Sequence, residues 1–390
     1  MISTGIATIV VAASASLFMA WAIGAGSSGS TPFAPAVGAN AISVMRAGFY
    51  VGVLGFAGAV LQGANVSEAI GAELIHNVSL SPLAATVALI TGATLVAIGV
   101  FAGYPIATAF TVTGAVVGVG LAMGGDPAWG KYRQILALWV ATPVVGGGVA
   151  FATARLLRGT TRDRLTIPAL AGVVGLVLAN VRFALLGPPN ADRSIASAIA
   201  NTLVGGAPVV EAVAGLGFAL VVAALVRWDV GREVAAAQRR FLVAIGSLVA
   251  FSAGGSQVGL AVGPLLPLLG ETVRIEFVLV GGGIGLLAGS WTGAPRMIKA
   301  VAQDYSSLGP NRSIAALIPA FVIAQVAVFF GIPVSFNEII VSAIVGSGLA
   351  VGSGGVSRSK MGYTVLAWAG SLALSLVVGY GVYRGIAALL

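Results

Sequence analysis

Gly103-Tyr-Pro-Ile-Ala-Thr-Ala-Phe-Thr-Val-Thr-Gly-Ala-Val-Val-Gly-Val-Gly-Leu-Ala-Met-Gly124 aligns without gaps with a second segment of the same chain, Gly331-Ile-Pro-Val-Ser-Phe-Asn-Glu-Ile-Ile-Val-Ser-Ala-Ile-Val-Gly-Ser-Gly-Leu-Ala-Val-Gly352. Nine of the 22 positions are identical, including Pro105/Pro333 and Gly118/Gly346. An apolar bias alone would produce scattered matches but not a shared framework of glycine and proline. The alignment therefore indicates an internal duplication.

A second matched pair lies at nearly the same spacing. Ala25-Gly-Ser-Ser-Gly-Ser-Thr-Pro-Phe-Ala-Pro-Ala36 pairs with the segment that begins at Gly254, so that Ser27 faces Ser256. Two pairs at one spacing predict a first repeat over residues 1–160 and a second over 235–390. Residues 161–234 are then predicted to form connecting helices.

The composition places the chain in a lipid bilayer. Hydrophobic residues make up 58% of the sequence, charged residues only 8%, and the mean hydropathy is +1.03. A soluble domain could not cover its surface with so few polar groups. Continuous apolar runs such as 83–104, 135–154 and 314–330 approach the roughly 20 residues that cross a bilayer as a helix, and they are too long and too uniformly apolar for barrel strands. We predict an all-α polytopic protein of the plasma membrane with about 10–12 transmembrane helices, the first of which begins near Ile6.

The four duplicated segments are also the places where the apolar pattern is interrupted. Gly, Ser and Pro break helices at 25–40, 103–124, 254–268 and 331–352, and within a membrane the freed backbone groups must be satisfied by protein or by a water-lined cavity. Interrupted segments at corresponding positions of two halves are typical of the midplane site of a secondary transporter. We therefore predict two inverted repeats whose broken or re-entrant helices meet at the midplane. The alternative reading is that these glycines serve helix packing and bind no ligand.

The distribution of charged residues indicates how the chain is oriented in the membrane more than which partners it binds. The net charge is +8, and the cationic residues gather in the connections around 155–164, 227–240 and 296–312, a pattern that favours the cytoplasmic side. The partners expected from this are membrane lipids and no nucleic acid. The sequence contains no cysteine, and no metal site, catalytic triad or nucleotide-binding loop is predicted. We expect no enzymatic activity and no cofactor.

Four motifs in order resemble those of the inorganic phosphate transporter (PiT) family. Ala250-Phe-Ser-Ala-Gly-Gly-Ser-Gln-Val-Gly-Leu-Ala-Val-Gly-Pro-Leu265 is similar to the family's A-F-x-x-G-A-N-D-V-A-N-A-x-G-P-L signature, and Gly331-Ile-Pro-Val-Ser-Phe-Asn-Glu338 to its G-x-P-V-S-T-T-H stretch. The first-half copies are more diverged. The resemblance spans almost the whole chain and implies cation-coupled uptake of phosphate, with sulfate permeases among the bacterial members.

The departures from the signatures define the candidate site. The family's Asn-Asp pair becomes Ser27-Ser28 in the first half and Ser256-Gln257 in the second. Helix breaks present unpaired N–H groups and a positive dipole end to an anion, and neutral donors would surround it. The candidate substrate-binding residues are Ser27, Ser28, Ser30, Thr31, Ser256 and Gln257, closed by Thr108, Ser335 and Asn337.

The missing signature carboxylates suggest a preference for sulfate over phosphate. Phosphate retains a proton near neutral pH and can donate it to a carboxylate, whereas sulfate only accepts hydrogen bonds. The resulting expectation is a permease for a tetrahedral oxyanion that resembles the sulfate permease branch and works by alternating access. A sodium-coupled phosphate transporter and a passive anion channel are the alternatives.

The coupling ion is expected to be Na⁺ or H⁺. Losing two carboxylates weakens the case for Na⁺, although backbone carbonyls at helix breaks can also hold it. Proton coupling needs a titratable group in the membrane, and Glu338 is the leading candidate because it lies in an apolar segment. The alternative is that Glu338 is an interfacial carboxylate at a helix end. The sequence leaves two oligomeric states open, a monomer and a homodimer.

Overall fold

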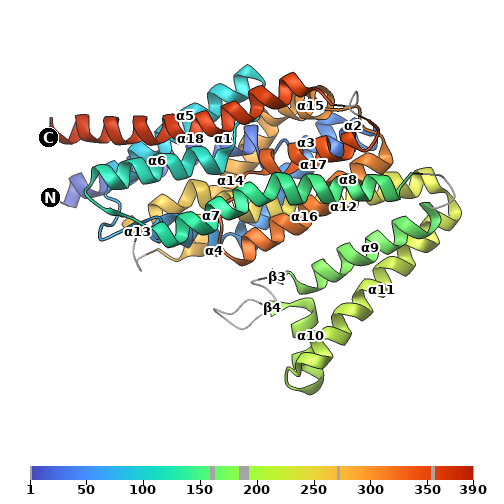
Figure 1. Cartoon of the computed structure of the whole chain (residues 1–390). Helices are drawn as coiled ribbons and strands as arrows, with labels where there is room; N and C mark the ends of the chain where they lie inside the picture. Colours follow the sequence, from blue (N-terminus) through green and yellow to red (C-terminus); the bar gives the residue numbers. More distant parts are fainter. Residues whose placement is uncertain (1, 159–162, 184–192, 270–272, 353–355, 390) are drawn as a thin grey trace.

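The computed structural model describes residues 2–158, 163–183, 193–269, 273–352 and 356–389. They form a bundle of helices that run along its length, with both chain termini at the same end (Figure 1). Ten helices in these ranges are long and apolar enough to cross a membrane. The chain is therefore an almost entirely helical, multi-span membrane protein, and the predicted all-α fold class is confirmed.

The helices before residue 158 are α1 (Ile2–Gly26), α2 (Ala34–Gly38), α3 (Val44–Gln62), α4 (Ala64–Ala72), α5 (Pro82–Ala102), α6 (Thr108–Ala122), α7 (Trp129–Ala141) and α8 (Gly147–Leu156). The π-helical turn Thr142–Gly146, with Pro143 in it, joins α7 to α8. Two short strands, β1 (Ile75–His76) and β2 (Asp126–Pro127), pair antiparallel beside α4 and α7.

The middle of the chain contains α9 (Asp163–Asn180), β3 (Arg182–Phe183), β4 (Arg193–Ser194), α10 (Ile195–Val204) and α11 (Pro208–Arg232). In Figure 1, α10 and the adjoining ends of α9 and α11 project away from the main bundle. The strands β3 and β4 pair antiparallel. These elements fall in the region predicted to connect the two repeats.

The helices that follow are α12 (Val234–Val262), α13 (Leu266–Leu269), α14 (Ile275–Thr292), α15 (Ala294–Asp304), α16 (Pro310–Phe329), α17 (Phe336–Leu349) and α18 (Arg358–Ala387). A 3₁₀ turn, Gly263–Leu265, separates α12 from α13. One predicted break is thus displaced: residues 254–262 continue α12, and the irregularity begins only at Gly263. Pro264 accounts for this position, because it lacks the N–H needed to continue the helical ladder.

Helix packing depends on close backbone approach at equivalent positions of the two halves. A Cβ built on Gly58 of α3 would lie 1.8 Å from the Phe251 carbonyl oxygen of α12. Its counterpart on Gly289 of α14 would lie 2.0 Å from the Trp21 carbonyl oxygen of α1. Small residues at such crossings allow membrane helices to pack backbone to backbone.

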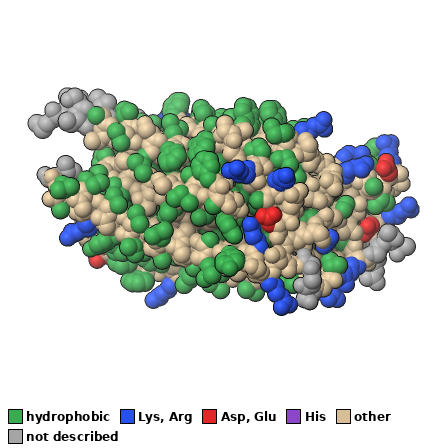
Figure 2. All heavy atoms as spheres, turned by 90° about the horizontal axis from the view of Figure 1, so that it is seen from above, with side chains coloured by type: hydrophobic (Ala, Val, Ile, Leu, Met, Phe, Trp, Pro, Cys, Tyr) green, Lys and Arg blue, Asp and Glu red, His purple; other side chains and the backbone are tan. Residues whose placement is uncertain are grey.

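Hydrophobic side chains cover most of the length of the molecule, as Figure 2 shows, and Lys and Arg are most numerous toward one end. That end contains the turn between α11 and α12, where Arg232 and Arg239 are exposed. A lipid-facing band with a basic end agrees with a membrane span whose basic end is predicted to be cytoplasmic.

Candidate functional site

Two short helices, α6 and α17, begin inside the protein at the duplicated motifs. At 15 and 14 residues they are shorter than the membrane-spanning helices, and we call them the half-length helices. Gly103 and Gly331 adopt left-handed φ values of +74° and +59° and end the preceding helices. An extended segment follows each glycine, and α6 then begins at Thr108 and α17 at Phe336. Both helix starts are buried. Because the first turn of a helix leaves its N–H groups without intrahelical partners, both starts offer donors in the protein interior.

Three candidate residues, from the turn after α1, the start of α6 and the interior of α12, are joined by hydrogen bonds. The Thr108 hydroxyl donates to Gln257 Oε1 at 2.7 Å, and Ser27 Oγ donates to the same oxygen at 3.2 Å. Thr108 Oγ1 and Ser27 Oγ lie 3.3 Å apart. The Gln257 amide nitrogen donates to the Val334 carbonyl oxygen, just before α17. Gln257 of α12 thus connects the end of α1 to both half-length helices.

Asn337 belongs to the same region. Its Nδ2 donates to the carbonyl oxygens of Gly26 at 2.9 Å and Ile106 at 2.6 Å. These two bonds fix the orientation of the amide, because the flipped rotamer would place Oδ1 against two carbonyl oxygens. The oxygen Oδ1 is left as a buried acceptor without a partner among the described residues.

Several other side-chain oxygens in this region are buried and unpaired. Within the described ranges, Ser256 Oγ, Ser335 Oγ and Glu338 Oε2 make no hydrogen bond. An unpaired buried polar atom costs about 1–3 kcal/mol, and such atoms are rare in native proteins unless a ligand, ion or water serves them. We call Ser27, Thr108, Ser256, Gln257, Ser335 and Asn337 the polar cluster; each of its members has no exposed surface.

The remaining candidates form the turn after α1. Ser30 Oγ and Thr31 Oγ1 both donate to the Ser27 carbonyl oxygen, at 3.2 and 3.0 Å. Ser28 is buried in the same turn, with 2% of its surface exposed. The structure therefore brings Ser27 into the hydrogen-bonded network, whereas the hydroxyls of Ser30 and Thr31 stabilise the local backbone.

The electrostatics of the polar cluster come from dipoles. None of its six members is ionisable, and Glu338, with 2% exposure, is the neighbouring titratable group in the first turn of α17. The described residues contain no group of three His, Cys, Asp or Glu side chains that could hold a metal ion. An anion here would be held by hydroxyls, amides and helix N-termini.

Two tryptophans near the cluster were not singled out from the sequence. Trp139 Nε1 donates to the Pro333 carbonyl oxygen at 2.9 Å, and Trp368 Nε1 donates to the Pro105 carbonyl oxygen at 2.8 Å. Each tryptophan therefore holds the extended segment of the opposite half. The sequence does contain an indication of their role, because the two tryptophans are 229 residues apart, which is also the spacing of the Ser27/Ser256 pair.

Comparisons with known proteins agree on one family. The family model described as "Phosphate transporter family" matches residues 23–379. A candidate phosphate permease of Thermococcus kodakarensis is 26% identical over 373 residues, covering 90% of each chain. A chloroplastic inorganic phosphate transporter of Arabidopsis thaliana is 24% identical over 400 residues, covering 90% of this chain and 67% of its own.

A solved structure has the same fold. The protein described as the sodium-dependent phosphate transporter superposes with a TM-score of 0.83 at 24% sequence identity, over 98% of this chain and 100% of its own. At this identity the likeness concerns the fold alone.

Proposed function

The chain belongs to the phosphate transporter family, and from that premise we propose that it is a secondary transporter that carries inorganic phosphate across the membrane. The observation that carries the proposal is the polar cluster, which lies at the buried starts of α6 and α17. Its unpaired hydroxyls and amide oxygen are complementary to a partly protonated oxyanion.

The hydrogen-bond inventory favours phosphate. The hydroxyls of Ser256 and Ser335 can donate to phosphate oxygens, and both lack a partner among the described residues. Asn337 Oδ1 can only accept, so it needs a ligand that brings a proton. Phosphate at neutral pH carries at least one proton, whereas sulfate would leave this acceptor unpaired.

The sulfate preference suggested by the missing signature carboxylates finds no support in the comparisons. The named relatives are described as transporters or permeases of phosphate, and phosphate is the better proposal. Sulfate stays a second candidate on one observation, the absence of any ionisable member from the polar cluster. A sulfate site would use the same neutral donors.

The coupling ion is proposed to be H⁺ carried by Glu338. This carboxylate is 2% exposed, and its Oε2 has no partner among the described residues. Carboxylates inside the membrane commonly serve as proton carriers in transporters, and Glu338 lies in the first turn of α17, next to Asn337 of the polar cluster. Na⁺ held by backbone carbonyls at the helix breaks is the alternative.

Two inverted repeats, 1–160 and 235–390, are proposed to move relative to each other in alternating access, with 161–234 as the connection. The reciprocal tryptophan bonds and the matched glycine contacts of α3/α12 and α1/α14 support this division. The polar cluster is closed to solvent, as a carrier between its two open states requires. Homodimer formation stays a prediction, and chemical crosslinking in native membranes would test it.

Uptake of radiolabelled phosphate into proteoliposomes tests the proposal. Imposed pH and Na⁺ gradients identify the coupling ion, and unlabelled sulfate as competitor identifies the substrate. We expect phosphate uptake that depends on a cation gradient, with weak competition by sulfate. Efflux accelerated by phosphate on the opposite side distinguishes a carrier from a channel. No uptake of radiolabelled phosphate above that of protein-free vesicles, together with clear uptake of radiolabelled sulfate, would overturn the assignment.

A further inference from the structure

Two lysines occupy equivalent positions in the two halves and make equivalent ion pairs. Lys131 Nζ lies 2.6 Å from a Glu73 carboxylate oxygen, and Lys360 Nζ lies 3.0 Å from an Asp304 carboxylate oxygen. The lysines are 229 residues apart, as are the two tryptophans. Glu73 directly follows α4, and Asp304 is the last residue of α15.

Each lysine also contacts the extended segment of the other half. Lys131 donates to the Gly331 carbonyl oxygen at 3.3 Å. Lys360 lies over the Tyr104 ring, 4.2 Å from its centre. Gly331 and Tyr104 belong to the segments that lead into α17 and α6. Each lysine therefore links an acidic helix end of its own half to the segment that positions a half-length helix of the other.

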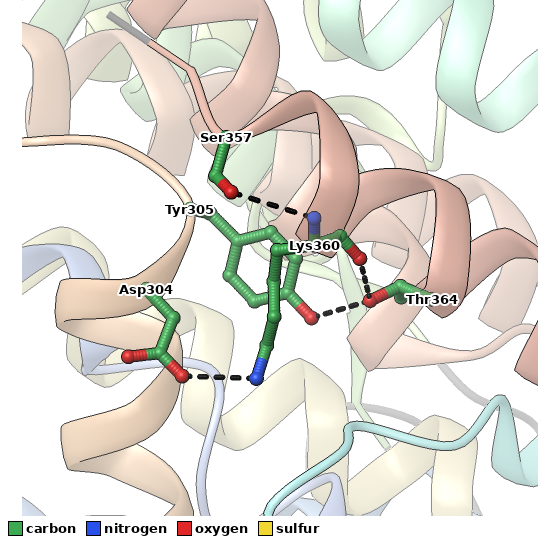
Figure 3. A network of polar contacts seen from close by, with 5 residues as sticks. All are labelled: Asp304, Tyr305, Ser357, Lys360 and Thr364. Atoms are coloured by element: carbon green, nitrogen blue, oxygen red, sulfur yellow. Dashed lines mark hydrogen bonds and ion pairs between the residues drawn. The ribbon is translucent and has the colours of Figure 1, made fainter.

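The surroundings of Lys360 are fixed by further bonds, drawn in Figure 3. The Tyr305 hydroxyl is 2.7 Å from Thr364 Oγ1, and Tyr305 is almost fully buried. Ser357 caps α18 by accepting from the Lys360 backbone N–H. The lysine side chain consequently leaves a rigid helix start, and its ammonium group reaches both Asp304 and Tyr104.

The two lysine contacts lie toward opposite ends of the bundle. Figure 1 shows α4 and the start of α7 in the half that contains both termini, and α15 and the start of α18 in the other half. Both contacts are connected to the polar cluster along the chain, since Thr108 directly follows the segment that Lys360 contacts and Ser335 ends the segment that Lys131 contacts. The lysine side chains are only 10% and 20% exposed, whereas their carboxylate partners are 53% and 41% exposed.

We propose that Lys131 and Lys360 are positioning residues that act as two latches, each holding the path to the polar cluster closed at one end of the molecule. Release of Lys131 frees the segment before α17, and release of Lys360 frees the segment before α6. Partly exposed ion pairs are weak, so thermal motion can open one latch while the other stays closed. The Lys360 latch lies at the basic, predicted cytoplasmic end. This inference rests on the proposed transport function, since a latch has a role only if the site opens.

Thiol labelling tests the two latches separately. The chain has no native cysteine, so Ser335→Cys and Ala107→Cys, at the residues before α17 and α6, are single reporters without background. A membrane-impermeant thiol reagent is added to vesicles of known sidedness, without phosphate. Lys131→Met should speed labelling of the Ser335→Cys reporter at least threefold from one side. Lys360→Met should do so for the Ala107→Cys reporter from the opposite side.

Matched variants separate a latch from a packing role. Lys131→Arg keeps the charge and the donors and should leave labelling unchanged. Lys299→Met removes the only other lysine of the chain, which is exposed on α15, and should also have no effect. Unchanged labelling in both latch variants, or acceleration from the same side or from both sides at once, would overturn the proposal. Because labelling is done without substrate and phosphate uptake is measured separately on the protein without reporter substitutions, such a result together with normal uptake by that protein would refute the latches and leave the transport function standing.

Discussion

Ser256→Ala should weaken phosphate binding without destabilising the protein. Ser256 lies on α12 next to Gln257, has no exposed surface, and its hydroxyl has no partner among the described residues. Removing a buried hydroxyl usually breaks a protein hydrogen bond and lowers stability. Here no such bond exists, so affinity and stability should respond differently.

The magnitudes follow from the cost of unpaired polar groups. A lost hydrogen bond to a charged ligand costs about 1–3 kcal/mol, which corresponds to phosphate binding weaker by about 5- to 150-fold. In the ligand-free protein the same deletion removes a buried polar group with an unmet hydrogen bond. The free energy of unfolding should therefore stay unchanged or rise.

The assay combines binding and unfolding in detergent. Radiolabelled phosphate binding gives the dissociation constant, and thermal unfolding followed by tryptophan fluorescence gives stability with and without phosphate. Stabilisation by phosphate should shrink in the variant, because ligand stabilisation falls as the dissociation constant rises.

Ser313→Ala is the matched control for this assay. The buried Ser313 hydroxyl donates to the Pro35 carbonyl oxygen at 2.7 Å, and that oxygen also accepts from the Ala39 N–H. The control should lose about 1 kcal/mol of stability, the usual worth of one hydrogen bond, and keep its affinity. If Ser256→Ala instead lowers stability and leaves affinity intact, the hydroxyl serves packing and the polar cluster is not the binding site.

Three further predictions concern coupling, packing and selectivity. Glu338→Gln should abolish acceleration of uptake by a pH gradient yet retain phosphate counterflow, because the amide cannot carry a proton; a variant that still responds to the pH gradient would exclude Glu338 as the coupling group. Gly346→Ala should lower the free energy of unfolding by about 1–3 kcal/mol through overpacking, measured as a lower unfolding temperature, because the added Cβ would lie 2.1 Å from the Gly147 carbonyl oxygen. Gly370→Ala has open space and should be neutral or stabilising by up to about 1 kcal/mol. Gln257→Asp should depress sulfate binding at least tenfold more than phosphate binding, since only phosphate can offer a proton to the new carboxylate; competition assays that show equal losses for both anions would contradict this.

The positions of the half-length helices could be predicted from the sequence because their determinants are local. Gly103 and Gly331 end helices through their own left-handed backbone, and Pro105 and Pro333 disfavour helix in the residues before them. The break after Gly26 follows from a run of Ser, Gly and Pro. At 254–262 the same composition proved compatible with continuous helix, because small residues there serve close packing against α3.

The partners of the polar side chains could not be predicted in the same way. Gln257 was expected to donate to the anion, but its amide also binds Ser27, Thr108 and Val334. These partners lie far from Gln257 in sequence, and the hydrophobic periodicity of a sequence does not indicate which distant residues come into contact. Gln257 connects α1, α6 and the segment before α17, and its role as a donor to an anion stays a prediction.

The absence of the signature carboxylates acquires a different meaning once Asn337 is in place. A comparison with the family signature considers only the residues at the signature positions. At those positions the carboxylates that could accept a proton from phosphate are missing. The structure supplies another acceptor, because two backbone carbonyls occupy the donors of the Asn337 amide and leave Oδ1 unpaired. Helix N-termini supply donors irrespective of side-chain identity. A site can therefore exchange its carboxylates for neutral groups and still distinguish a protonated oxyanion from one without a proton, provided that a single buried oxygen is prevented from finding a partner within the protein.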